Sequence, residues 1–195
     1  MTGGSEMKTQ HATPRAGRGR LRAALGRFRR AEDGATAVEF AIVAAPFFFM
    51  LFAMIELAIV FTISTTLDDG MRAAARQIRT GQLQTAGGAS AASFRTNVCE
   101  RMVWLEDHCM THLSVDVRTY PQWSTANPPN PVQSDGTFND GGLTFVPGGP
   151  EDIVLARGFY RWKLFTPFLS QALGKLKNGE AVVTAAATFR NEPYQ

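Results

Sequence analysis

The longest apolar stretch of the chain lies near its N-terminus, at residues 35–64. Between Phe40 and Phe61 the only ionisable residue is Glu56. A helix needs about 20 mainly apolar residues to cross the hydrocarbon core of a membrane, whereas a cleaved secretory signal has an apolar region of only about 7–15 residues. The stretch therefore predicts a transmembrane helix over residues 35–64, in which Pro46 is tolerated.

Helical spacing of apolar residues continues beyond this stretch. Gly70 weakens the continuation, and Gly81 is a residue that favours the end of a helix. We therefore expect the helix to leave the lipid as an amphipathic stalk that ends near Gly81. The apolar positions that follow the i, i+4, i+7, i+11 pattern are Leu67, Met71, Ala74 and Ile78.

Two further elements are expected before residue 120. Apolar residues at helical spacing predict a second amphipathic helix from Ser90 to Leu105. From Leu113 to Tyr120 apolar and polar residues alternate, which is typical of a strand with one buried face. Residues 65–120 therefore contain amphipathic helices and the first strand of a folded domain.

The rest of the chain predicts a loop and two strands. Residues 121–150 contain six Pro and five Gly, which indicates a long surface loop. Residues 151–195 supply two more strands, at about 152–164 and 181–190, with a short helix or a lipid-facing turn between them. We therefore predict an α+β protein with a long transmembrane helix, an amphipathic stalk, a second helix and a three- to four-stranded antiparallel sheet.

Positive charge is concentrated before the apolar stretch. Residues 1–30 hold eight of the 20 Lys and Arg residues, so residues 35–195 hold 12 basic residues against 14 acidic ones. Basic residues flanking an apolar helix stay on the cytoplasmic side, so residues 1–34 are expected to be a basic cytoplasmic leader. A nucleic-acid-binding domain would carry its charge in the folded part, and we expect no nucleic acid partner.

A short motif marks the boundary between the leader and the apolar stretch. Gly34 is followed by ATAVEF, which places Glu39 five residues later and Phe40 next. This pattern resembles the type III signal sequence of type IV prepilins. More specifically, the stretch RRAEDGATAVEFAIVAAPFFFMLFAMIELAIVF resembles the TadE/TadG-like pseudopilins (minor pilins) of Tad, or tight adherence, systems, which assemble Flp pili. The segments RWKLFTPFL and ATFRNEPY are also similar to TadE-like chains.

The resemblance implies a processing site formed by Gly34, Ala35, Glu39 and Phe40. A prepilin peptidase would cut after Gly34, where the missing Cβ lets the backbone approach the catalytic groups, and the mature chain would begin at Ala35. Glu39 would then lie near the positive end of the helix dipole and could pair with the new ammonium group. The simpler interpretation is that Glu39 lies among the lipid headgroups in the first turns of an ordinary anchor.

The resemblance also implies a location and partners. The chain would cross the bacterial inner membrane once, with a periplasmic C-terminal domain, and could enter the pilus. Its partners would be membrane lipid, the prepilin peptidase, other pilins and the pilus assembly machinery. Ala35 departs from the Phe or Met that begins many mature pilins, and the long body favours a minor pilin. The alternative is an uncleaved, membrane-anchored scaffold or binding component of a secretion machine.

The two cysteines, Cys99 and Cys109, lie beyond the predicted membrane helix, in an oxidising compartment if this topology holds. A disulfide between them would stabilise the fold by roughly 2–3 kcal/mol in the loop-entropy model. The other interpretation is a zinc site that adds His108 and His112. Adjacent His108 and Cys109 suit a single ion poorly, so we expect the disulfide and no metal.

Other candidate groups have simpler explanations. Glu56 would reach the outer headgroups or contact a partner helix. Asp135, Asn139 and Asp140 could offer oxygens to calcium, but their spacing does not match an EF-hand, and turn chemistry is the simpler account. The sequence contains no phosphate-binding loop, nucleophile elbow or paired-carboxylate motif. We therefore expect no enzymatic activity, no cofactor and no small-molecule substrate; a membrane-tethered hydrolase would require a perturbed carboxylate or histidine pair.

Overall fold

The computed structural model describes residues 32–194, so the predicted leader lies outside the described residues except for its last three positions. The chain divides after Met50 into two compact units. Helix α2 (Glu32–Arg79) forms the described part of the first unit and begins the second. Its 48 residues confirm the predicted long helix, which runs through Pro46 without a break.

In the first unit, α2 carries apolar side chains that the protein does not cover. Phe40, Ile42 and Phe47 are each more than 60% exposed. The helix is long and apolar enough from Thr36 onward to cross a membrane. Exposure of this kind matches contact with lipid or with other apolar helices, because soluble monomers rarely expose large contiguous apolar surfaces.

The second unit contains a three-stranded antiparallel sheet in the order β1-β2-β3. The strands are β1 (Leu113–Tyr120), β2 (Ile153–Lys163) and β3 (Glu180–Arg190), close to the predicted positions. Helix α6 (Pro167–Leu173) lies in the connection between β2 and β3, where the sequence predicted a short helix or turn. Together with α2, these elements confirm the predicted α+β class.

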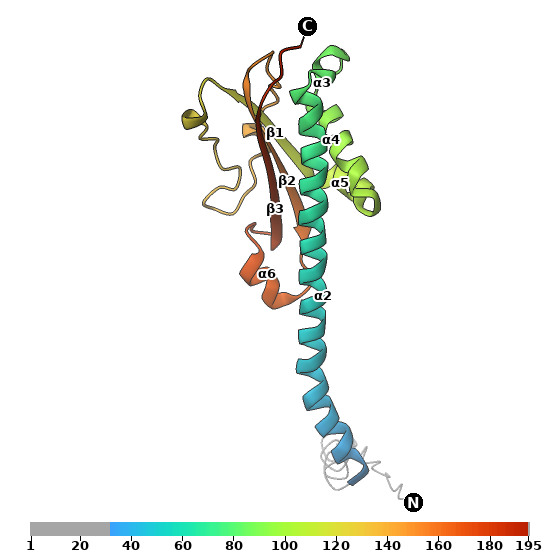
Figure 1. The fold of residues 1–195 in the computed structure, drawn as a ribbon. Helices are drawn as coiled ribbons and strands as arrows, with labels where there is room; N and C mark the ends of the chain where they lie inside the picture. The colour runs from blue at the N-terminus through green and yellow to red at the C-terminus, as the bar shows by residue number, and fades with distance from the viewer. Residues whose placement is uncertain (1–31, 195) are drawn as a thin grey trace, which may run out of the picture. The chain divides into compact units, whose positions relative to one another are not determined.

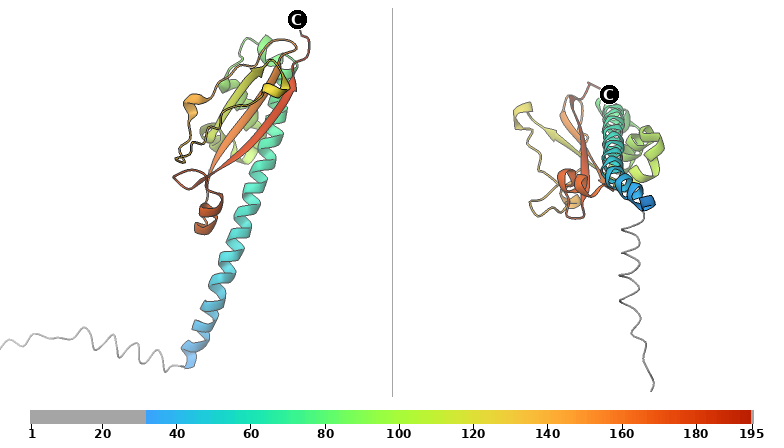
Figure 2. Two further views of the ribbon diagram at one scale, coloured as in Figure 1. Left: turned by 90° about the vertical axis from the view of Figure 1, so that its left-hand side faces the viewer. Right: turned by 90° about the horizontal axis from the view of Figure 1, so that it is seen from below.

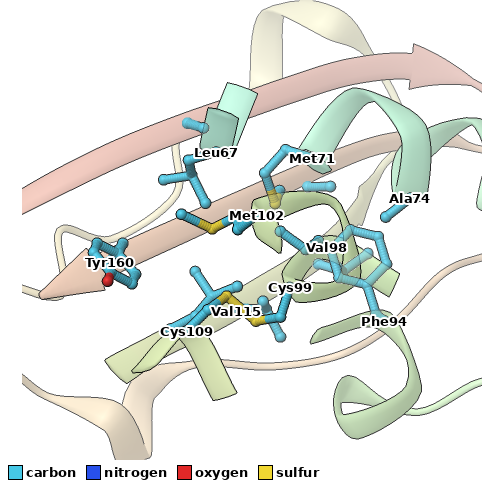
Figure 3. Close-up of a cluster of buried hydrophobic side chains, with 14 of the residues drawn as sticks. Leu67, Met71, Ala74, Phe94, Val98, Cys99, Met102, Cys109, Val115 and Tyr160 are labelled. Carbon is cyan, nitrogen blue, oxygen red and sulfur yellow. A yellow bond between two sulfur atoms is a disulfide. The ribbon is translucent and has the colours of Figure 1, made fainter. Parts of the chain in front are cut away.

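One face of the sheet packs against the helices (Figures 1 and 2). The apolar stripe of α2 enters this core as predicted, with Leu67, Met71, Ala74 and Ile78 all buried. Gly158 of β2 allows the close approach, since a Cβ there would lie 2.8 Å from the Met71 Sδ atom. Figure 3 shows buried side chains of α2 and of the segment after Ser90 gathered over the sheet, with the Cys99–Cys109 disulfide among them.

The predicted second helix begins where expected but is broken. Ser90 caps α4 (Ala91–Cys99) through a reciprocal bond pair with Ser93. A 3₁₀ segment, η1 (Glu100–Leu105), follows, and Val103 has non-helical dihedral angles. The chain then forms α5 (Glu106–His112), which the periodicity did not predict. The prediction of a single helix from Ser90 to Leu105 was therefore wrong, because tertiary packing interrupts the helix that the apolar spacing predicted.

The remaining elements are short helical segments that follow the end of α2. Gly81 ends the stalk with φ 74°, a conformation that suits glycine, as predicted. The short helix α3 (Gln82–Thr85) follows at once. Within residues 121–150 the only helical segments described are two 3₁₀ turns, η2 (Trp123–Thr125) and η3 (Asp140–Gly142).

The expectation that one face of β1 is exposed was wrong. Ser114 and Asp116, on the polar face of the strand, are both buried. The loop at residues 121–150 folds back over this face, and its residue Phe145 forms an isolated parallel bridge with Val117. The loop thus supplies one rung of a fourth strand and covers the side of the sheet opposite the helices.

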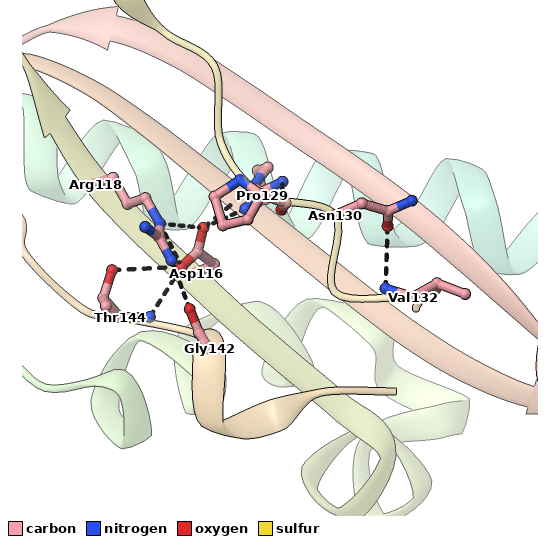
Figure 4. Close-up of polar contacts among 8 residues, drawn as sticks. Asp116, Arg118, Pro129, Asn130, Val132, Gly142 and Thr144 are labelled. Carbon is pink, nitrogen blue, oxygen red and sulfur yellow. Dashed lines mark hydrogen bonds and ion pairs between the residues drawn. The ribbon is translucent and has the colours of Figure 1, made fainter. Parts of the chain in front are cut away.

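An ionic cluster holds this loop against the sheet (Figure 4). Asp116 accepts bonds from the guanidinium groups of Arg157 and Arg118, at 2.6 and 3.0 Å, and from the Thr144 N–H at 2.9 Å. Arg157 also donates to the Pro129 carbonyl at 3.0 Å. Burial alone raises the pKa of Asp116, but these hydrogen bonds outweigh it and hold the pKa below its usual value.

Candidate functional site

The predicted processing residues all lie in α2. Gly34 and Ala35 are helical positions, and the Glu39 and Phe40 side chains are exposed. In the part of the chain that the structure describes, Glu39 has no hydrogen-bond or ion-pair partner. An unpaired carboxylate beside exposed apolar residues is available to a group outside this chain.

Glu56 has a different environment from Glu39. Its side chain is fully buried, and its carboxylate accepts two backbone hydrogen bonds from the segment after β2. The Phe165 N–H donates to Oε1 at 2.6 Å, and the Thr166 N–H donates to Oε2 at 2.9 Å. Charged acceptors make such bonds short and strong.

These bonds change the interpretation of Glu56. The sequence offered two explanations, headgroup contact or a partner helix, and the structure shows a third, in which the acid binds its own chain. Thr166 is the N-cap residue of α6 and makes no capping bond with its own side chain. Glu56 therefore fixes the two residues that lead into α6 to α2. No sequence signal could identify this pair, because the donors are backbone groups more than 100 residues away.

The surface of α2 around Glu56 is apolar. Met54, Leu57 and Phe61 are 63, 46 and 70% exposed. From Thr36 onward, Glu56 is the first buried position of α2, and Ile63 and Leu67 follow it into the core. The helix is thus packed against the domain on one side while its other sides still present apolar groups.

The cysteine prediction is confirmed. Cys99 and Cys109 form a disulfide, with their Cα atoms 5.5 Å apart. It joins the end of α4 to α5 across the break at η1. The two sulfur atoms are bonded to each other and are not available as thiolate ligands. This disulfide excludes the zinc site that required both cysteines.

The histidines of that alternative make other contacts. The rings of His108 and His112 stack with centroids 3.8 Å apart, and His108 Nδ1 lies 2.6 Å from the Tyr160 hydroxyl. Burial, together with the neighbouring His112, lowers the pKa of His108. Burial raises the pKa of Tyr160 to about 12. These side chains therefore form a packed group beside the disulfide. Within residues 32–194, no set of three or more acidic, His or Cys side chains is placed to hold a metal ion.

The candidate calcium residues serve turns and ion pairs instead. Asp135 accepts bonds from the N–H and hydroxyl of Thr137, the geometry of an Asx turn. Asp140 accepts bonds from the Ser114 hydroxyl at 2.6 Å and from Arg161 at 3.0 Å. The hydrogen bonds from Thr137 and Lys177 lower the pKa of Asp135 to about 2. Each carboxylate is thus already used by the fold.

Fold and site together define a class: an α+β protein with one apolar helix suited to membrane anchoring near its N-terminus. Residues 34–76 match the family model described as TadE-like protein, which confirms the resemblance over this part of the chain. The match begins at Gly34 and covers the apolar helix and most of the stalk. It supports, in general terms, an association of this protein with Tad pili. No curated protein and no solved structure matches the chain.

Proposed function

We propose that this protein is a minor pilin, or pseudopilin, of a Flp pilus system. It crosses the bacterial inner membrane once through α2, with its N-terminus in the cytoplasm and its α+β domain in the periplasm. The observation that carries the proposal is the TadE-like match, which begins at Gly34 and continues along a helix with exposed apolar side chains.

The processing step rests on the spacing at the start of α2. Cleavage after Gly34 by a prepilin peptidase would remove residues 1–34 and leave an ammonium group on Ala35. Glu39 lies four residues later, one helical turn away, so its exposed carboxylate could pair with the ammonium of its own chain or of a neighbour. Pairing favours the charged form of a carboxylate in an apolar environment.

The assembly role rests on the surfaces of the two units. In the first unit, large apolar side chains of α2 remain uncovered, and such a surface binds lipid or other apolar helices. The domain of the second unit is held by a disulfide and an ionic cluster. We infer a structural role, in which the helix anchors and packs with other pilins and the domain faces the periplasm.

The proposal is tested by coexpressing the chain with a prepilin peptidase. The expected result is loss of residues 1–34, detected as a smaller product on gels. Gly34→Ala should block the conversion, because a Cβ hinders close approach of the cut backbone. Gly26→Ala, a matched change within the leader, should leave it intact. Equal conversion of both variants, or no conversion of the natural chain, would contradict the processing step.

The alternative is an uncleaved scaffold of a secretion machine. It shares the anchor and the domain but retains the basic leader in the cytoplasm. The same coexpression separates the two, since only the pilin hypothesis requires a new N-terminus.

A further inference from the structure

We propose that the protein has a second contact with the membrane, made by the junction between β2 and α6. The contact surface consists of Phe165, Leu173 and Lys175, and its partner is the outer leaflet of the phospholipid bilayer that α2 crosses. This inference rests on the proposed membrane anchor and goes beyond it, because it assigns lipid contact to the folded domain.

The depth of the junction follows from the bonds of Glu56. The N–H groups of Phe165 and Thr166 lie 2.6 and 2.9 Å from the Glu56 carboxylate, so the junction is level with Glu56 along α2. Phe61, five residues further along the helix, is 70% exposed. At 1.5 Å per residue, the apolar surface of α2 thus continues about 7.5 Å beyond the level of the junction. A membrane that covers Phe61 therefore also reaches Phe165.

The exposed side chains of the junction are of the kind expected where a protein segment contacts the membrane surface. Phe165 is 55% exposed and Leu173 is 38% exposed, although both belong to the folded domain. Lys175, two residues after α6, is exposed as well. Apolar groups with a nearby lysine are typical of a segment that lies in the interface, where the lysine reaches anionic headgroups. Figure 1 shows α6 at the end of the sheet nearest the N-terminal side of α2.

The hydrogen bonding of the junction is also what lipid contact requires. Non-helical backbone is tolerated at membrane depth only where its polar groups bond within the protein. Glu56 satisfies the two N–H groups at the turn into α6, and those groups in turn satisfy a carboxylate in an apolar region.

The test uses the full chain with one introduced cysteine carrying a nitroxide spin label. Among the described residues the natural cysteines are joined to each other, and the sequence contains only those two, so the label reacts with the new thiol. The labelled protein is reconstituted in vesicles of phosphatidylethanolamine and phosphatidylglycerol. Its accessibility to oxygen, which concentrates in lipid, is compared with its accessibility to a water-soluble nickel chelate.

Three sites with similar native exposure are compared. Phe165→Cys reports on the junction, Met54→Cys reports on α2, and Trp123→Cys, where the native residue is 54% exposed, lies at the opposite end of the sheet. The oxygen-to-nickel ratio at Phe165 should be close to that at Met54 and severalfold above that at Trp123. Leu173→Cys provides a second site on the same surface and should agree with Phe165.

The outcomes separate this inference from the proposed function. A lipid-like ratio at Met54 with a water-like ratio at Phe165 and Leu173 would overturn the second contact and leave the anchor intact. A water-like ratio at Met54 would contradict the anchor itself. Protection of Phe165 from both reagents would mean that protein, and not lipid, covers the junction, which would also overturn the inference.

Discussion

At the scale of single residues, two glutamates in the same helix have opposite environments. Glu39 is exposed and without a partner in the described part of the chain, whereas Glu56 is buried and bonded to two backbone N–H groups. A carboxylate in an apolar region requires compensation. Glu56 finds it within the folded domain, and Glu39 depends on a group from outside or on a new N-terminus.

Replacing Glu56 should destabilise the domain. Glu56→Ala leaves the Phe165 and Thr166 N–H groups without an acceptor, and each unsatisfied donor costs about 1–3 kcal/mol. Glu56→Gln keeps one acceptor oxygen and should cost less. Urea unfolding in detergent measures the change, and hydrogen exchange at the two amides locates it. If the Glu56→Ala variant unfolds at the same urea concentration as the natural protein, these two hydrogen bonds contribute nothing to the free energy of unfolding.

Protonation of Asp116 should lower the free energy of unfolding at acid pH. Its pKa is lowered in the folded state, so its contribution is complete above the unfolded value and is lost as the pH falls through the folded one. The urea midpoint should therefore start to drop as the pH approaches the ordinary aspartate pKa of about 3.9, and it should drop further toward the lower folded value.

A substituted chain identifies the source of this pH dependence. Asp116→Asn should already be destabilised at neutral pH, by roughly 3–5 kcal/mol, because Arg157 then lacks its charged partner. It should also lose much of the acid-dependent drop. Asp107→Asn, at an exposed carboxylate, should retain the drop. Equal pH profiles for the natural chain and Asp116→Asn would contradict the assignment.

At the scale of elements, close contact between α2 and α4 depends on a glycine that the sequence alone marks as a weakness. A Cβ at Gly70 would lie 2.8 Å from the Val98 carbonyl oxygen. Gly70→Ala should therefore destabilise by roughly 1–3 kcal/mol through overpacking, although the same change in an exposed helix stabilises by about 1 kcal/mol.

The matched control for this substitution is Gly88→Ala, where a Cβ would meet no atom within 4 Å. Thermal unfolding of the two variants should separate them, with Gly88→Ala close to the natural protein. Stabilisation by Gly70→Ala would mean that the helices do not approach as closely as the structure shows.

The disulfide stabilises the broken helical region between α4 and α5. Reduction should lower the free energy of unfolding by roughly 2–3 kcal/mol in the loop-entropy model. Urea unfolding with and without reductant measures this difference. In the double variant Cys99→Ser, Cys109→Ser the reductant should have no effect, and an equal response of both proteins would rule out the disulfide as the cause.

Local pattern was sufficient for most elements of the fold. The long apolar stretch, followed by apolar residues at helical spacing, predicted α2, and short apolar segments predicted all three strands to within a few residues. The break after Cys99 and the burial of Asp116 were missed because both depend on contacts with distant segments. The same limit applies to the site: the Gly34–Glu39 spacing is visible in sequence, whereas the partners of Glu56 are backbone groups that only the fold brings close.

At the scale of the whole molecule, the structure combines an apolar helix with a compact domain that shares that helix. The apolar stripe of α2 from Ile63 to Ile78 is part of the core, so this part of the helix belongs to the folded domain. The TadE-like match covers this anchor and most of the stalk.

The central claim is that the anchor begins at a processed N-terminus. The most direct measurement is the N-terminal mass of the natural chain extracted from membranes of cells with an active prepilin peptidase. The account predicts a protein that begins at Ala35. An intact protein that still begins at Met1 in those cells would contradict it.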